Sequence, residues 1–175
     1  METAESVKCS ICDADITEGV ILGFEKTDNY DILMCDNCCQ EYDTLKTNRL
    51  KGRYLSNYQK CLYLALKHQL SELDVYFEWA DKDVLGKVLK TVDIAIPSAK
   101  LYIEVNGAQH VENCEQLRSD LWRSYYSFNA GFLTLSVFND AIKSVEEFYQ
   151  IVGFLVDIAH AMEKRSKSIA SQKRE

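Results

Sequence analysis

The chain has 175 residues, of which 47% are hydrophobic and 27% are charged, and it contains seven glycines and one proline. This composition excludes a disordered or collagen-like chain, and the length suits a domain of a little over about a hundred residues with a small additional module. No apolar run approaches the roughly 18 residues that cross a membrane, and the first residues lack the basic and apolar segments of a secretory signal. We therefore expect a cytoplasmic protein that has no membrane partner.

Acidic and basic residues are concentrated in different parts of the chain. Residues 1–45 contain two basic and eleven acidic residues, whereas the other 130 residues contain 18 basic and 16 acidic residues. A basic stretch without acids follows the acidic segment, and residues 164–175 form a second basic segment that we expect to be a disordered tail. Basic residues contact nucleic-acid phosphates, although a linker and a tail of this composition can also act only as solubilising segments. The predicted phosphate contacts in the first stretch are Lys46, Arg49, Lys51, Arg53 and Lys60.

The acidic segment contains two Cys-x-x-Cys pairs, with two apolar runs and a polar turn between them. A hairpin formed by these runs brings the two pairs together, so the pattern predicts a structural zinc site with no open position for catalysis. The four expected ligands are Cys9, Cys12, Cys35 and Cys38. Cys39 is an alternative to Cys38 as the fourth ligand, and a redox pair is the alternative to a metal site. Residues 1–45 are therefore predicted to form a zinc ribbon.

The rest of the chain shows helical and strand patterns in turn. Apolar residues recur at steps of three and four in a helix, whereas they alternate with polar residues in a strand. These patterns predict, in chain order, a helix at 56–71, strands at 75–79, 88–96 and 101–105, a helix at 112–129, a strand at 132–138 and a final helix capped by Asn139 or Asp140. We interpret Trp122, Tyr125 and Tyr126 in the second helix as packing residues, and platforms on which bases stack are the alternative. The expected fold class is α+β.

Two carboxylates interrupt the apolar alternation of neighbouring predicted strands. Asp93 lies in the strand that ends at Pro97, and Glu104 lies in the strand that ends before Gly107. A buried carboxylate is costly unless a cation or hydrogen bonds compensate for its lost hydration. A Mg²⁺ ion shared by Asp93 and Glu104 would supply this compensation and would lower the pKa of an attacking water. Buried salt bridges are the alternative, and their candidate partners are Lys90, Lys100 and Arg123.

Several strings between Ser56 and Val137 recur together in one known family. They are the strand Val-Asp-Ile-Ala-Ile-Pro around Asp93, the string Ile-Glu-Val-Asn-Gly-Ala-Gln-His that ends at His110, the pair Asp120-x-x-Arg123 and the strand that follows Gly131. In these strings the chain resembles the restriction-endonuclease-like PD-(D/E)xK superfamily, and within it the Vsr-like and EDxHD endonucleases. The resemblance implies a restriction-endonuclease-like core at 46–163, with the order helix, three strands, helix, strand, helix, preceded by the zinc-ribbon hairpin.

The resemblance also implies a function, that of a metal-dependent DNA endonuclease. Asp93 and Glu104 would be the paired Mg²⁺ or Mn²⁺ ligands, and His110 would activate water or protonate the leaving group. Asn106 and Gln59 would position water or phosphate. Asn106 stands where the general motif has lysine, and Gln59 stands where the family often has glutamate. The alternative is therefore a catalytically inactive nuclease-fold protein that binds DNA or another protein.

The predicted partner is double-stranded or structured DNA, and a homodimer is an arrangement that the sequence leaves open. Arg123, three residues after Asp120 on the second helix, is predicted to pair with that aspartate and to reach either the acidic centre or a phosphate. The zinc ribbon carries a formal charge of −9, from two basic and eleven acidic residues, so we do not expect it to bind the DNA backbone. We expect it to position a protein surface or a dimer contact.

Overall fold

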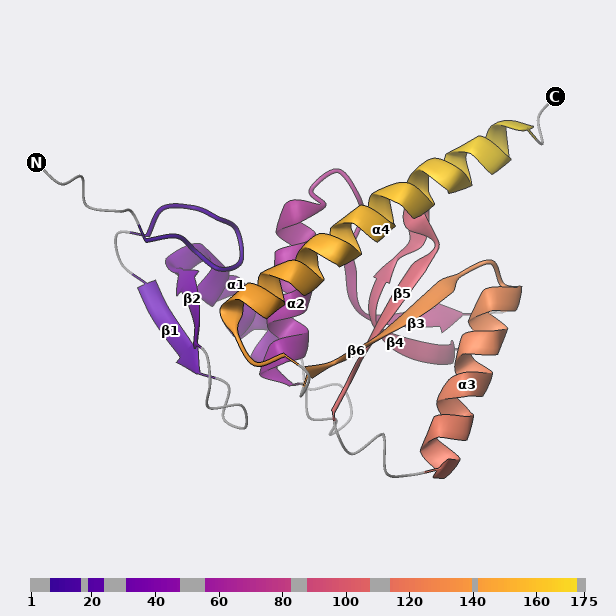
Figure 1. Ribbon diagram of the computed structural model, residues 1–175, viewed down its shortest axis with the longest axis horizontal. Coiled ribbons are helices and arrows are strands. Elements are labelled where there is room, and N and C mark those ends of the chain that lie inside the picture. Colours follow the sequence, from indigo (N-terminus) through magenta and orange to yellow (C-terminus); the bar gives the residue numbers. More distant parts are fainter. Residues whose placement is uncertain are drawn as a thin grey trace, which may run out of the picture.

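The computed structural model describes residues 7–16, 19–23, 31–47, 56–82, 88–107, 114–139 and 142–172 (Figure 1). The helices are α1 Asp36–Thr47, α2 Asn57–Gln69, α3 Cys114–Asn129 and α4 Val145–Gln172, with a 3-10 turn, η1, at Pro97–Ala99. The strands are β1 Gly19–Gly23, β2 Asp31–Cys35, β3 Tyr76–Lys82, β4 Val88–Ile96, β5 Leu101–Asn106 and β6 Leu133–Phe138. The α+β fold class is confirmed.

The strands form two sheets. β1 and β2 make an antiparallel hairpin, whereas β3, β4, β5 and β6 lie in that order in a mixed sheet. β4 is antiparallel to both β3 and β5, and β5 is parallel to β6. The helix α3 connects the two parallel strands, as a parallel connection requires. The order helix, three strands, helix, strand, helix agrees with the order expected from the sequence.

The helix α2 has a well-defined start and a buried face. Ser56 caps it, because the side-chain oxygen of Ser56 accepts a hydrogen bond of 3.1 Å from the backbone N–H of Gln59. Its apolar residues recur at helical spacing and are fully buried, among them Leu62 and Leu66 at 0% exposure. Figure 1 shows α4 lying across α2, and the rings of Tyr58 on α2 and Phe148 on α4 meet edge to face at 5.7 Å.

One hydrophobic core joins the N-terminal hairpin to the rest of the protein. Ile32 and Met34 of β2 and Tyr42 of α1 belong to the same buried cluster as Leu62 of α2 and Ile94 of β4. The hydroxyl of Tyr42 also donates a hydrogen bond of 2.5 Å to Asn57 Oδ1 at the start of α2. The hairpin and α1 therefore belong to the same hydrophobic core as α2 and the mixed sheet, and their stability is coupled to that of this core.

The helix α1 was not expected from the sequence, which we interpreted at this place as a metal knuckle followed by a linker. The buried residues Cys38 and Tyr42 and the partly buried Leu45 lie four and three residues apart on α1. This spacing is the helical signal that the cysteine motif obscured. As a consequence, the second cysteine pair spans the junction of β2 and α1 instead of a second loop.

The final helix differs from its prediction at both ends. Ser144 caps α4 through a 3.1 Å hydrogen bond from the N–H of Glu147 to Ser144 Oγ, so neither Asn139 nor Asp140 is the cap. The helix continues to Gln172, so residues 164–172, expected to be a disordered tail, are helical. No glycine or proline follows Gly153 in this stretch, and Lys167 pairs with Glu163 one turn earlier.

The apolar side of α3 is exposed, which corrects our interpretation of its aromatic residues as packing residues. Trp122, Tyr125 and Tyr126 are 50%, 52% and 64% exposed, whereas Ser127 is 2% exposed. The helix packs against β6 through the side that carries Ser127. Its apolar periodicity does not mark a buried face. None of the helices in the described part of the chain combines the length and the hydropathy that a membrane span requires.

Candidate functional site

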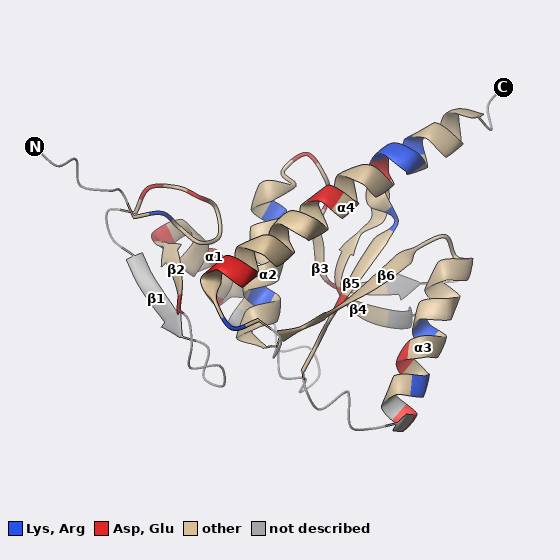
Figure 2. Cartoon of the chain, viewed as in Figure 1, with Lys and Arg blue, Asp and Glu red and all other residues tan. Residues whose placement is uncertain are grey.

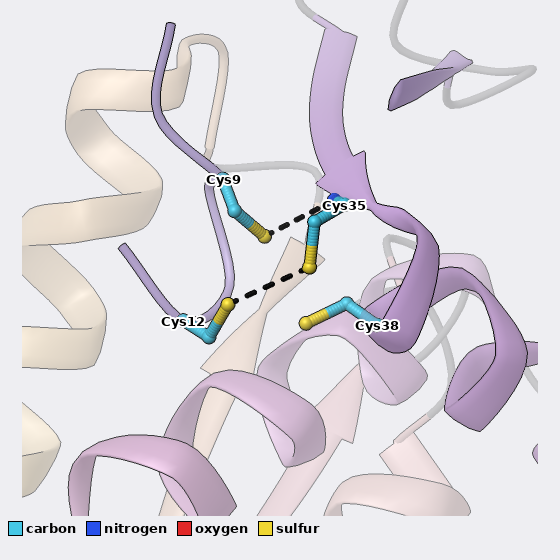
Figure 3. A group of neighbouring side chains, drawn as sticks. All are labelled: Cys9, Cys12, Cys35 and Cys38. Carbon is cyan, nitrogen blue, oxygen red and sulfur yellow. Dashed lines mark hydrogen bonds between the residues drawn. The ribbon is translucent and has the colours of Figure 1, made fainter. Parts of the chain in front are cut away.

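The four predicted zinc ligands lie together in the structure. The sulfur atoms of Cys9, Cys12, Cys35 and Cys38 are all within 4.8 Å of one another, and Figure 3 shows the four side chains converging on one point. Cys39 lies outside the group, and its sulfur points to the carbonyl oxygen of Met34 at 3.9 Å. The structure thus places Cys38, and not Cys39, at the fourth position.

The local backbone explains how the first pair is held. The N–H of Ser10 donates to the carbonyl of Leu33, and the N–H of Leu33 donates to Ser10 Oγ, so this knuckle is fastened to β2. Asp13 closes the knuckle with a φ of +61°, a left-handed conformation that aspartate tolerates better than most residues. The second pair needs no such loop, because Cys35 ends β2 and Cys38 lies in the first turn of α1.

The spacing of the sulfurs fits a tetrahedral zinc ion. Zinc–sulfur bonds of about 2.3 Å in tetrahedral geometry separate two ligand sulfurs by about 3.8 Å. The Cys12 and Cys35 sulfurs are 3.7 Å apart, far beyond the roughly 2.05 Å of a disulfide bond. All four cysteines are present as free thiols in the structure. These four residues can therefore hold a metal such as zinc.

The electrostatics of the group also favour a bound cation. Burial acts to raise the pKa of the Cys9 thiol, but the N–H groups of Cys35 and Ile11, at 3.4 and 3.5 Å, donate to its sulfur and bring the pKa down to about 7. Burial and the neighbouring Cys12 thiol raise the pKa of Cys38. Four thiols at this spacing, two of them buried and two partly buried, cannot all ionise unless a cation neutralises them, and metal binding drives that ionisation.

His68 lies against the cysteine group, which the sequence did not indicate. Its Nε2 atom is 3.8 Å from the Cys38 sulfur and 3.6 Å from Glu41 Oε1. His68 also lines a pocket of about 370 Å³ between the first knuckle, the end of α2 and Tyr149 of α4. A histidine 30 residues after its cysteine neighbour gives no recognisable spacing, so only the fold shows this contact.

The second candidate site lies on the mixed sheet, around Asp93 and Glu104. The last residue pair of the β4–β5 ladder is Ile94–Ile103, and Asp93 immediately precedes Ile94 on β4 while Glu104 immediately follows Ile103 on β5. Asp93 is 4% exposed, and its Oδ2 atom accepts a 2.8 Å hydrogen bond from the N–H of Val105. Glu104 is partly buried. The two carboxylates therefore occupy neighbouring strands, as predicted.

Gln59 and Glu78 extend this group of polar residues. Gln59, 6% exposed on α2, donates a 2.7 Å hydrogen bond from Nε2 to Glu78 Oε1 on β3. Glu78 lies between Phe77 and Trp79, whose partners on β4 are Ile94 and Val92, so it stands opposite Asp93. Its φ of +49° marks a local irregularity in β3. Three adjacent strands thus carry a carboxylate at the same level.

The other predicted residues fall in different places. Asn106 is the last residue of β5 and pairs with Phe138 of β6, while His110 lies outside the described residues. Among the residues described, the cysteines are the only group of three or more metal-ligating side chains whose ligand atoms all lie within 4.8 Å.

Of the residues predicted to contact phosphate, the structure describes the side chains of Lys60 and Arg123. Lys60 is 5% exposed, and its Nζ atom lies 5.0 Å from the centre of the Tyr42 ring, so this lysine is an interior residue. Arg123 is exposed on α3, and its NH1 atom is 3.9 Å from Asp120 Oδ1, which is the predicted pairing. Arg49, Lys51 and Arg53 lie outside the described residues, as does the side chain of Lys46.

No family model matches the chain, and comparisons with curated proteins and with solved structures find no match.

Proposed function

We propose that this protein is a metal-dependent DNA endonuclease with a structural zinc site in its N-terminal hairpin. The observation that carries the proposal is the placement of Asp93 and Glu104 on neighbouring strands of a mixed sheet, one step beyond the pair Ile94–Ile103. Both residues lie next to the last pair of the β4–β5 ladder, and in this proposal their carboxylates share one cation. The order of helices and strands is also the one that the resemblance to PD-(D/E)xK nucleases implies.

Burial gives these carboxylates a reason to bind a cation. Asp93 is 4% exposed, Glu78 lies on β3 between the partners of Ile94 and Val92, and Glu104 follows the partner of Ile94 on β5. Like charges on adjacent strands destabilise one another, and a divalent cation reverses that effect. In this proposal Asp93 and Glu104 hold Mg²⁺ or Mn²⁺, and Glu78 keeps Gln59 in place through the 2.7 Å hydrogen bond between them.

Each remaining residue then has a task in phosphodiester hydrolysis. When bound, the divalent ion supplies a lowered water pKa and polarises the phosphodiester. Gln59 and Asn106 hydrogen-bond the water or a phosphate oxygen, and His110 exchanges a proton with the water or the leaving group. In the N-terminal hairpin, Cys9, Cys12, Cys35 and Cys38 hold zinc as a closed site whose task is structural.

A second candidate function is DNA or protein binding without catalysis. It is favoured by the neutral side chains of Gln59 and Asn106 at positions where a nuclease of this type often carries charge. In that case the carboxylates of the sheet serve only the structure, and the zinc site is the one metal site that the protein uses.

Metal binding separates the two candidates. Zinc-loaded protein is titrated with Mn²⁺, and bound Mn²⁺ is followed by electron paramagnetic resonance in wild type, Asp93→Asn and Glu104→Gln, with Glu72→Gln as the matched control. Glu72 is an exposed glutamate that pairs with His160 of α4 at 2.6 Å. The nuclease predicts one Mn²⁺ site that both sheet variants lose and that the control keeps. A protein with zinc but no Mn²⁺ site, and with salt-dependent affinity for DNA, would be a binding module.

A further inference from the structure

Six large apolar side chains are exposed on one helix, α3. Their exposed fractions range from 45% for Leu117 to 73% for Phe128. The six are Leu117, Leu121, Trp122, Tyr125, Tyr126 and Phe128, and we call them the α3 face. The rings of Trp122, Tyr125 and Tyr126 lie 5.6–6.0 Å from one another, so they form one continuous surface. Figure 1 shows α3 at the end of the molecule opposite the N-terminal hairpin, with no other labelled element beyond it.

The area of the α3 face exceeds what an isolated protein usually exposes. A large side chain offers about 200 Å², so six residues with exposed fractions of 45–73% leave about 700 Å² in contact with water. The largest apolar patch of a typical monomer covers roughly 300–600 Å². If two copies covered each other, about 1,400 Å² would be buried, which lies within the roughly 1,200–2,000 Å² of a stable, specific interface.

The charges around the α3 face match a second copy better than a nucleic acid. The described part of α3 carries two acids, Glu115 and Asp120, and two bases, Arg118 and Arg123, and Figure 2 shows both signs along the helix. A surface that binds the phosphate backbone needs an excess of positive charge, which α3 lacks. A neutral face is complementary to itself, because no like charges accumulate when two copies meet.

We propose that this protein forms a two-fold symmetric dimer through the α3 face. The two α3 helices lie antiparallel, with the symmetry axis between Leu121 and Trp122. Arg118 of one copy then lies over the Tyr125 ring of the other as a cation–π pair. The inference goes beyond the proposed nuclease function and does not depend on it, since it follows from α3 alone.

Sedimentation velocity of the full-length, zinc-loaded protein tests the dimer over about 1–200 µM. The two matched variants are Leu121→Glu on the α3 face and Phe154→Glu on α4, whose residues are 71% and 60% exposed. We expect a dimer for wild type and for Phe154→Glu, and a dissociation constant raised by at least about 100-fold for Leu121→Glu. Circular dichroism checks that each variant is folded.

Three results would overturn the proposal. The first is a wild type that stays monomeric at the highest concentration. The second is a dimer that persists in Leu121→Glu but is disrupted in Phe154→Glu. The third is a monomeric wild type whose affinity for DNA is lost in Leu121→Glu. The last result would assign the α3 face to nucleic acid. If Leu121→Glu does not fold, hydroxyl-radical labelling of wild type replaces it: Trp122 and Tyr126 must become protected as the concentration rises, and constant labelling contradicts the dimer.

Discussion

Removal of the metal from the cysteine site is expected to destabilise the whole protein and not only the hairpin. The hairpin and the first turns of α1 contribute Ile11, Ile32, Met34 and Tyr42 to the common core, each at most 1% exposed. Burial of one such side chain stabilises by roughly 1.5–3 kcal/mol, so about 8 kcal/mol of burial depends on the closed hairpin. This is comparable to the roughly 5–15 kcal/mol by which a domain is stable.

The matched variants for this prediction are neighbours in the sequence. Cys38→Ser removes a sulfur of the site, whereas Cys39→Ser removes a sulfur that lies outside it. We expect Cys38→Ser to lose zinc, measured by elemental mass spectrometry, and to lower the melting temperature by about 15–30 °C, followed by circular dichroism. Cys39→Ser and wild type should melt alike, and EDTA should affect both. An unchanged melting temperature in protein shown to be free of metal would refute the reasoning.

Three further predictions concern single groups in the remainder of the chain. Gln59→Glu places a second carboxylate beside Glu78, and we expect it to lower the free energy of unfolding in EDTA by about 1–3 kcal/mol, with recovery in Mg²⁺, as measured by urea denaturation. Ser144→Ala removes the cap that accepts the N–H of Glu147, and it should lower the free energy of unfolding by about 1 kcal/mol in the same assay, whereas Ser144→Asp should retain it. Burial raises the pKa of Cys61 to about 12, so its thiol stays protonated at pH 8 and should react with a disulfide reagent only after denaturant is added; rapid labelling of Cys61 in folded protein would contradict this.

The sheet and most of the helices were predictable because their apolar periodicity is strong and their boundaries are marked chemically. β4 ends where Pro97 begins, and α2 begins after the Ser56 cap. The helix α1 was missed because Cys38, in its first turn, was interpreted as part of a metal motif. The exposed face of α3 could not be foreseen, since the periodicity of an apolar stripe shows that residues share a side and not that anything covers it.

The two sites differ in how much of them the sequence contains. The cysteine ligands were predictable because metal coordination requires a fixed residue type at a fixed spacing. The sheet carboxylates Asp93 and Glu104 were predictable from their place in apolar strands. The hydrogen bond of Gln59 to Glu78 depends on a left-handed residue in β3, and the contact of His68 with Cys38 depends on how α2 packs against α1. Such contacts are properties of tertiary packing.

Cleavage of DNA is the most direct test of the proposed function. Folded, zinc-loaded protein is incubated with supercoiled plasmid and with labelled linear, mismatched and branched DNA in Mg²⁺, Mn²⁺ or EDTA. The account predicts cleavage by wild type and by Glu72→Gln in Mg²⁺ or Mn²⁺, no cleavage in EDTA, and rates at least about 100-fold lower for Asp93→Asn and Glu104→Gln. Absence of cleavage by wild type on every substrate, or cleavage that both sheet variants retain, would contradict it.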